Sequence, residues 1–297
     1  MEKMEYDIDL GGVCNNNCLF CSQGEKGVST NERDLSLKEV KATAKKISGN
    51  CEGIIITGGE PTLRDYLPEL LIYLKKLKFK KIQLQSNGRR FAYEDYCKQI
   101  VDTGVTEFSI ALNSHLAEHH DQLSTVQNSF KQTLGGIRNL KKHKAFVTAN
   151  AIITKINYKD LPDLANLMIT EGVDKLKYSF VRGIGNAFDN KKDIVPSMKE
   201  VIPYLKKALD IGKKFNKKMW VVAVPNCLLE EHMEYLSAMH IPVKNTKKMI
   251  KDYIIERFDK TRAKPKKCEK CKYFLSCVGP WKEYVEKYGI KEFIPVK

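Results

Sequence analysis

"EYDIDLGGVCNNNCLFC", residues 5–21, begins with a strand-like run and continues into two glycines and three closely spaced cysteines. Five further strand-like runs follow, and amphipathic stretches separate them. They are "GIIITGG" (53–59), "KIQLQSN" (81–87), "EFSIALN" (107–113), "FVTANAII" (146–153) and "KLKYSFV" (175–181). Helices are expected near 36–48, 65–77, 93–103, 124–142, 159–171 and 197–216, where apolar residues recur at helical spacing.

Six strand–helix units predict an α/β fold with a parallel sheet, because each helix carries the chain back across one face. The residues alone leave two closures open, a doubly wound sheet and a barrel. In both, ligands bind at the C-terminal edges of the strands. These edges read GGVC, TGGEPT, QSNG, ALNS, ITKIN and FVRGIGNA, which suits a ligand-facing rim. Ser36 and Glu39 predict a capping box at the first helix.

Composition narrows the class of protein. The chain has 297 residues, a net charge of +15 and nine cysteines. It has no apolar run of membrane-span length and no signal-like N-terminus, so we expect a cytoplasmic protein. Cysteines in such a chain favour metal or redox chemistry over disulfides. The charge is mostly lysine, which indicates a solvated surface or attraction to an acidic substrate or RNA. No nucleic-acid motif supports RNA binding.

Cys14, Cys18 and Cys21 have the spacing C-x3-C-x2-C, and the next cysteine is Cys51. A structural zinc site normally needs four ligands, and a disulfide would leave one thiol unpaired. A cubane iron–sulfur cluster held by three thiolates fits better, and it leaves one iron open to an outside ligand.

This motif, placed after a first strand and followed by "GGEPT" after the second, resembles the signature of radical S-adenosylmethionine (SAM) enzymes. The resemblance implies a partial (β/α)6 TIM-like barrel. It also implies that the open iron of a [4Fe–4S] cluster binds the methionine part of SAM. One electron then cleaves SAM to methionine and a 5′-deoxyadenosyl radical, which takes a hydrogen atom from the substrate. The cofactors carry the difficult step, and the protein positions them.

The same resemblance implies SAM contacts at the strand ends. Gly58, Gly59 and Glu60 are expected at the SAM amino group, Ser86 and Asn87 at the carboxylate or ribose, and Ser109 and Asn113 near the ribose. Asn150, Thr154 and Arg182 follow on the later strands. For the positions after Asn87, ordinary polar strand ends are an equally good interpretation. No catalytic residue is identified.

A second cysteine group lies near the C-terminus. "KMWVVAVPNC" (218–227) predicts a strand ending at Cys227, and Cys268, Cys271 and Cys277 follow. Four thiols favour a second [4Fe–4S] cluster over a four-cysteine zinc site. The arrangement resembles the twitch extension of radical SAM enzymes. We therefore expect a radical SAM core at 1–216 and a small α+β auxiliary-cluster domain at 217–297. Its cluster could accept an electron from the substrate radical or, with one iron open, bind the substrate. Four candidate ligands favour the electron-transfer role.

The leading hypothesis is an enzyme that oxidises a peptide or a small natural-product precursor. Modification of RNA or a nucleotide is one alternative, and a non-catalytic iron–sulfur or zinc module is another. We expect an electron donor such as flavodoxin or ferredoxin, a monomer, and no N-terminal leader-binding domain.

"HLAEHHDQL" (115–123) contains His115, His119, His120 and Asp121, for which substrate contact or a solvated loop is expected. Cys51 and Cys97 are expected to be inert thiols.

Overall fold

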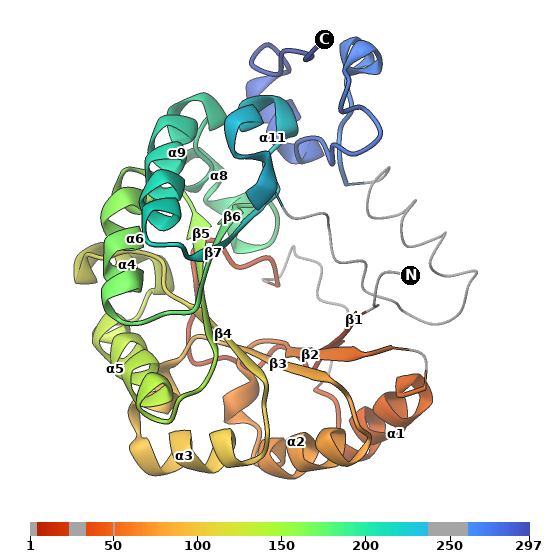
Figure 1. Ribbon diagram of the computed structural model, residues 1–297, viewed down its shortest axis with the longest axis vertical. Coiled ribbons are helices and arrows are strands. Elements are labelled where there is room, and N and C mark those ends of the chain that lie inside the picture. Colours follow the sequence, from red (N-terminus) through yellow and green to blue (C-terminus); the bar gives the residue numbers. More distant parts are fainter. Residues whose placement is uncertain (1–4, 24–33, 50, 237–260) are drawn as a thin grey trace.

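The structure is a computed structural model, and it describes residues 5–23, 34–49, 51–236 and 261–297. A seven-stranded sheet forms its centre, with every strand parallel to its neighbours and the strands in chain order. The sheet curves into a half-barrel (Figure 1). The strands are β1 (Glu5–Asp9), β2 (Gly53–Thr57), β3 (Lys81–Ser86), β4 (Glu107–Ala111), β5 (Val147–Ile153), β6 (Lys175–Phe180) and β7 (Lys218–Val222).

Helices cover the convex side of this sheet, as Figure 1 shows. The helices of the described residues are α1 (Leu37–Ile47), α2 (Leu67–Lys76), α3 (Glu94–Asp102), α4 (Ala117–Ser124), α5 (Ser129–Lys142), α6 (Leu161–Thr170), α7 (Asn186–Asp189), α8 (Lys191–Ile194), α9 (Met198–Lys214) and α11 (Lys282–Tyr288). The predicted capping box of Ser36 and Glu39 is present. The helix predicted at 124–142 begins only at Ser129, because Thr125 and Asn128 have positive φ angles and separate it from α4.

The two faces of the sheet differ in chemistry. The convex face is apolar and packs on the helices through fully buried side chains such as Ile54, Ile56 and Ile110. Successive side chains of a strand point to opposite faces, so the positions between them line the concave interior. That interior is polar: the side chains of Glu107 and Lys175 lie 2.9 Å apart, and Lys81 pairs with Glu5 at 2.8 Å. A polar lumen suits a ligand site better than a sealed core does.

The sheet has one strand more than the six that were predicted for the barrel. The seventh, β7, was expected as the start of a separate appendage and as ending at Cys227. It instead ends at Val222 and pairs in parallel with β6, while Asn226–Leu228 form a 3₁₀ turn. The sequence shows a strand here but not its register, which tertiary pairing decides. The boundary between residues 216 and 217 stays a prediction.

The C-terminal segment packs on the same core. The Tyr284 ring meets Phe180 edge-on at 5.6 Å, and its hydroxyl accepts a hydrogen bond from the Met198 backbone N–H at 2.6 Å. Trp281, Tyr284 and Phe293 belong to the hydrophobic core that contains the strands. None of the helices in the described part of the chain has both the length and the apolarity that crossing a bilayer demands.

Candidate functional site: two cysteine centres on a half-barrel

The three early cysteines lie on one loop that follows β1 at the C-terminal edge of the sheet. Elements from distant parts of the chain fix this loop. The backbone N–H of Leu19 donates to the carbonyl of Leu123 at 3.0 Å, and that of Asn186 donates to the carbonyl of Cys21 at 2.9 Å. The Asn186 amide also donates to the Cys18 carbonyl at 3.0 Å. The loop is therefore held from both α4 and the segment after β6.

Gly59 sets how closely β2 approaches the same loop. Its N–H donates to the Gly11 carbonyl at 2.6 Å, and the next N–H, of Glu60, donates to the Val13 carbonyl at 2.8 Å. A Cβ added to Gly59 would lie 2.3 Å from the Val13 oxygen, which is far inside van der Waals contact. Gly185 is similar, with a φ of +59° and 2.4 Å from an added Cβ to the Cys21 oxygen. Only glycine fits at these two approaches.

The pKa values of the three thiols bear on whether they can bind a metal cluster. Burial, and then the neighbouring Cys21 and Cys14, raise the pKa of Cys18 to about 12. Burial also raises the pKa of Cys14, although its sulfur accepts a hydrogen bond from the Asn16 N–H at 3.4 Å. Thiols this close oppose one another's ionisation, and bound iron removes that opposition because it binds the thiolate form. The donor set therefore fits a cluster with three cysteine ligands.

Within the described ranges, no group of three or more His, Cys, Asp or Glu side chains has the geometry of a single-ion site. That result does not conflict with a cubane. Each thiolate of a cubane binds a different iron, so its ligands stand farther apart than the ligands of one ion.

Glu60 ties the ends of β2 and β3 together. Its side chain is 1% exposed and accepts hydrogen bonds from the Ser86 hydroxyl at 2.8 Å, the Asn87 N–H at 2.7 Å and both the N–H and hydroxyl of Thr62. Burial raises the pKa of this carboxyl group against the lowering effect of the donors. Four protein donors favour an organising role for Glu60 and Ser86. Their contacts with SAM remain predictions.

Arg89 holds the cysteine loop in place through hydrogen bonds, a role that was not predicted from the sequence. Its guanidinium donates to the Asn15 carbonyl at 2.6 Å and to the Asn16 side chain at 2.7 Å. The Asn87 amide supports the same loop by donating to the Asn15 side chain at 2.6 Å. Arginine directly after a polar strand end, in "SNGRR", was the only available signal.

The later predicted SAM residues take up different positions. Ser109 is buried on β4, and Asn150 on β5 accepts a hydrogen bond from the Ser179 hydroxyl at 2.9 Å. Asn113 is 3% exposed and accepts from the Ile152 N–H at 3.0 Å, which indicates a structural role. Arg182 pairs with Glu283 at 2.9 Å and lies over the Trp281 ring, so its charge already has a partner.

Thr154 belongs to a turn rather than to a ligand-facing edge. Its side chain is fully buried, and its backbone N–H and hydroxyl both donate to the Asn157 side chain, at 2.7 and 2.9 Å.

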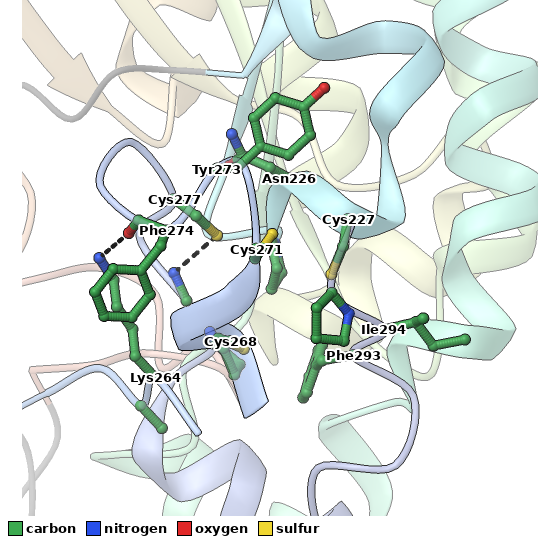
Figure 2. Close-up of a pocket in the computed structure, with 15 residues that line it drawn as sticks. Asn226, Cys227, Lys264, Cys268, Cys271, Tyr273, Phe274, Cys277, Phe293 and Ile294 are labelled. Carbon is green, nitrogen blue, oxygen red and sulfur yellow. Dashed lines mark hydrogen bonds between the residues drawn. The ribbon is translucent and has the colours of Figure 1, made fainter. Parts of the chain in front are cut away.

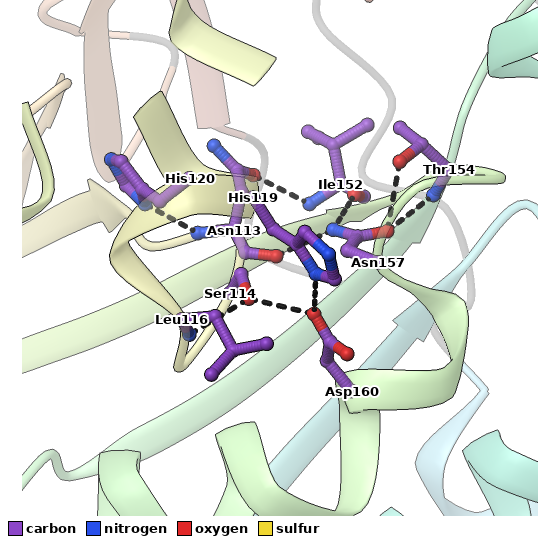
Figure 3. A network of polar contacts seen from close by, with 9 residues as sticks. All are labelled: Asn113, Ser114, Leu116, His119, His120, Ile152, Thr154, Asn157 and Asp160. Atoms are coloured by element: carbon purple, nitrogen blue, oxygen red, sulfur yellow. Dashed lines mark hydrogen bonds and ion pairs between the residues drawn. The ribbon is translucent and has the colours of Figure 1, made fainter. Parts of the chain in front are cut away.

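The histidines after β4 divide between two networks (Figure 3). His119 Nδ1 lies 2.6 Å from the carboxylate of Asp160, which also accepts from the Ser114 hydroxyl at 2.7 Å. His120 instead faces the core, where its Nδ1 accepts from the Asn113 N–H at 3.3 Å. Burial lowers the pKa of His120 to about 4, so this ring is neutral at pH 7. The two adjacent histidines thus face different surroundings.

Asp121 has a structural part in the same segment. Its carboxylate accepts from the backbone N–H groups of Asn128 and Phe130, at 2.6 and 2.7 Å, and joins α4 to α5. Cys97 is buried and Cys51 partly buried, and burial raises the pKa of each thiol to about 12 and about 11. Such thiols are poor nucleophiles.

The second cysteine group lines one cavity. Cys227, Cys268, Cys271 and Cys277 stand around this space together with Tyr273, Phe274 and three prolines, among others. Figure 2 shows the four sulfurs facing this common space. Burial, and then the other three cysteines, raise the pKa of Cys227 to about 11.

The spacing of these thiols bears on the choice of metal. One zinc ion holds each of its sulfurs at about 2.3 Å. Among the described residues no three such side chains come together in that way, and a cluster, whose thiolates bind different irons, fits these four cysteines better than one zinc ion does. The N–H of Gly279 donates to the Cys277 sulfur at 3.4 Å, and hydrogen bonds of this kind tune iron–sulfur clusters.

Comparisons with known proteins bear on the whole arrangement. The family model described as "Radical SAM superfamily" matches residues 8–168, more than half of the chain. A "Probable GTP 3',8-cyclase" of Sulfurisphaera tokodaii is 26% identical over 180 residues, 60% of this chain and 56% of that protein. An "Fe-coproporphyrin III synthase" of Methanosarcina barkeri is 26% identical over 164 residues, 55% of this chain and 40% of that protein. The chain thus spans about half the length of these relatives.

Solved structures share the fold. Streptococcus suis SuiB bound to S-adenosylmethionine aligns over 94% of this chain and 72% of its own, with a TM-score of 0.70 and 15% identity. The structure titled "Native anSMEcpe with bound AdoMet and Kp18Cys peptide" aligns over 99% of this chain and 93% of its own, with a TM-score of 0.70 and 14% identity. The half-barrel is therefore the partial TIM-like fold that was expected. With its cysteine loop and its family match, this chain belongs to the radical SAM superfamily of enzymes, which implies a [4Fe–4S] cluster and SAM as its cofactors.

Proposed function

We propose that this radical SAM enzyme abstracts a hydrogen atom from a peptide or small natural-product precursor and oxidises it with the help of a second [4Fe–4S] cluster. The carrying observation is the cavity lined by Cys227, Cys268, Cys271 and Cys277, next to a half-barrel whose first loop holds three more thiols. Four cysteine ligands would complete every iron of that cluster. Full ligation favours electron transfer over substrate binding.

The residues of this chain have separate tasks in the proposal. Cys14, Cys18 and Cys21 would hold the first cluster, which when bound would supply the one-electron reduction that cleaves SAM. Gly59 and Arg89 keep the cysteine loop at its place on the rim. Gly58, Ser86, Asn87, Ser109 and Asn150 remain the strand-end groups that we propose as SAM contacts. Cys227, Cys268, Cys271 and Cys277 would hold the second cluster, which would supply an acceptor for the electron of a substrate radical. A flavodoxin or ferredoxin is the proposed external redox partner.

A peptide substrate is supported by two fold neighbours. Their titles describe SuiB bound to its precursor peptide SuiA, and anSMEcpe bound to a peptide. These proteins are only 14–16% identical to this chain, so they support the fold directly and the substrate class only by analogy.

Nucleotide modification is a second candidate, because a relative at 26% identity is named as a probable GTP 3',8-cyclase. Adding GTP, or a panel of cysteine- and serine-containing peptides, to the reduced enzyme separates the two. The true substrate class raises the rate of 5′-deoxyadenosine formation, and the other leaves it at the background rate.

The main test compares metal content with SAM cleavage. After anaerobic reconstitution, the wild-type chain is expected to hold about eight irons, as two cubanes require. Cys268→Ala/Cys271→Ala should lose about half of that iron, keep 5′-deoxyadenosine formation after dithionite reduction, and lose product. Cys51→Ala is the matched control, since that thiol lies outside both groups. Unchanged iron content in the double variant would remove the second cluster from the proposal.

A further inference from the structure

The inner face of β6 carries two lysines at successive inward positions. Leu176 and Tyr178 are fully buried on the convex side. Alternation along the strand therefore directs Lys175, Lys177 and Ser179 into the half-barrel. Lys177 lies in register with Asn150 of β5 and Trp220 of β7. Two residues along a strand span about 7 Å, so Lys177 sits about that far below Ser179 and the rim.

The two lysines differ in their partners. The Lys175 ammonium pairs with Glu107 at 2.9 Å and lies 4.3 Å from the centre of the Trp220 ring. Across the described ranges, Lys177 makes no comparable hydrogen bond or ion pair. Burial, and then the nearby charge of Lys175, lower the pKa of Lys177, although Glu107 and Asp7 act in the opposite direction. Lys177 is thus a basic side chain inside the lumen, and none of the described residues pairs with it directly.

Such a residue is costly for the fold. Lys177 is partly buried, and a partly buried ammonium without a partner loses some of its hydration and gains no contact in return. The sheet does not need this charge, because the Glu107–Lys175 pair and its neighbours already link the strands across the lumen. Lys177 lowers the stability of the fold and lies below the C-terminal edge of the sheet, where SAM is proposed to bind. Residues that lower stability in this way are expected at functional sites.

We propose that Lys177 binds an anionic group of the substrate, a carboxylate or a phosphate, inside the half-barrel. This inference rests on the proposed function, because it takes the lumen below the SAM rim as the substrate site. It narrows the substrate class to molecules that carry an anionic group within reach of β6. The inward register of Lys177, and the lack of a hydrogen-bond or ion-pair partner for it among the residues that the structure describes, carry the assignment.

The test measures anion binding directly. Inorganic phosphate and glutarate, a dicarboxylate, are titrated calorimetrically into the reconstituted, SAM-loaded protein at constant ionic strength. At least one of them is expected to bind the wild type, and its affinity should fall about tenfold or more in Lys177→Met, as the loss of a charge-assisted contact predicts. Lys218→Met is the matched control, because Lys218 is an exposed lysine on the adjacent strand. The affinity of this variant for the same anion should equal that of the wild type.

The two probes also distinguish the source of the charge. Preference for phosphate points to a phosphorylated or nucleotide substrate, and preference for glutarate points to a carboxylate. Binding of neither probe, or equal binding by the wild type and Lys177→Met, overturns the inference.

Two further measurements keep the outcomes separate. The melting temperature of Lys177→Met should equal or exceed that of the wild type, because a desolvated charge is removed. A lower melting temperature would assign Lys177 a structural role and overturn the inference. Formation of 5′-deoxyadenosine by the wild type tests the proposed function alone. Its absence rejects that function, while anion binding without dependence on Lys177 rejects only the inference.

Discussion

Gly59→Ala tests whether the approach of β2 to the cysteine loop positions the first cluster. The added Cβ would lie 2.3 Å from the Val13 oxygen and 2.6 Å from the Gly12 oxygen, both backbone atoms of the loop. Ordinary contact begins at 3.4 Å, so the loop and the strand end must separate by about 1.1 Å. Backbone atoms cannot rotate away as a side-chain tip can. Overpacking of this kind costs about 1–3 kcal/mol.

That displacement also stretches two hydrogen bonds, from Gly59 to Gly11 and from Glu60 to Val13. Cys14 directly follows Val13, so its sulfur moves with the loop. We expect Gly59→Ala to fold with a lower melting temperature and to bind markedly less iron at the first site after anaerobic reconstitution.

The measurement is iron and sulfide per chain, together with the visible absorbance of the cluster. Gly12→Ala is the matched control, because it lies in the same loop and an added Cβ there meets nothing within 4 Å. Wild-type iron content and melting temperature in Gly59→Ala would refute this account of the loop. A similar loss in Gly12→Ala would show that any substitution in the loop suffices.

Two other predictions concern the strands. Burial alone would raise the pKa of Glu107, but Lys175, Thr148 and Lys81 lower it from 4.5 to about 2. A carboxyl group whose pKa is lower in the folded than in the unfolded chain stabilises the fold at pH values above its unfolded pKa. This contribution is lost as pH falls from about 4.5 towards 2, and it amounts to about 3 kcal/mol. Urea unfolding at pH 7 and pH 3 should show this dependence, and Glu107→Gln should largely abolish it; an unchanged slope in the variant would contradict it. Arg182→Met should lower the melting temperature, because the guanidinium joins β6 to α11 through Glu283 and Trp281, while SAM affinity changes less than about threefold. A tenfold loss of SAM affinity would instead support the predicted SAM contact.

Much of the fold follows from local patterns. Alternating strand-like and helical stretches predict parallel pairing, because only a crossover returns the chain to the same edge. The inward and outward faces follow from alternation too, as Leu176 and Lys177 illustrate. The placement of β7 did not follow, since nothing in "KMWVVAVPNC" states which strand it joins.

The site was predicted less completely, because sequence position does not reveal a polar group's partner. Glu60 and Ser86 end their strands as expected, yet they hydrogen-bond to each other. Arg89 and Asn186 were missed, since their contacts with the cysteine loop span many residues. The meeting of four thiols from two separate stretches was anticipated only because cysteines are few and their chemistry is narrow.

The contact between Asn186 and the loop of Cys18 joins residues 168 positions apart. A ribosome releases the three early thiols long before it has made the asparagine that restrains them. Until then the nascent loop has only the restraints that earlier parts of the chain supply, from Gly59, Arg89 and Leu123. The C-terminal restraint on the iron-binding loop is therefore added only after the sixth strand has been translated.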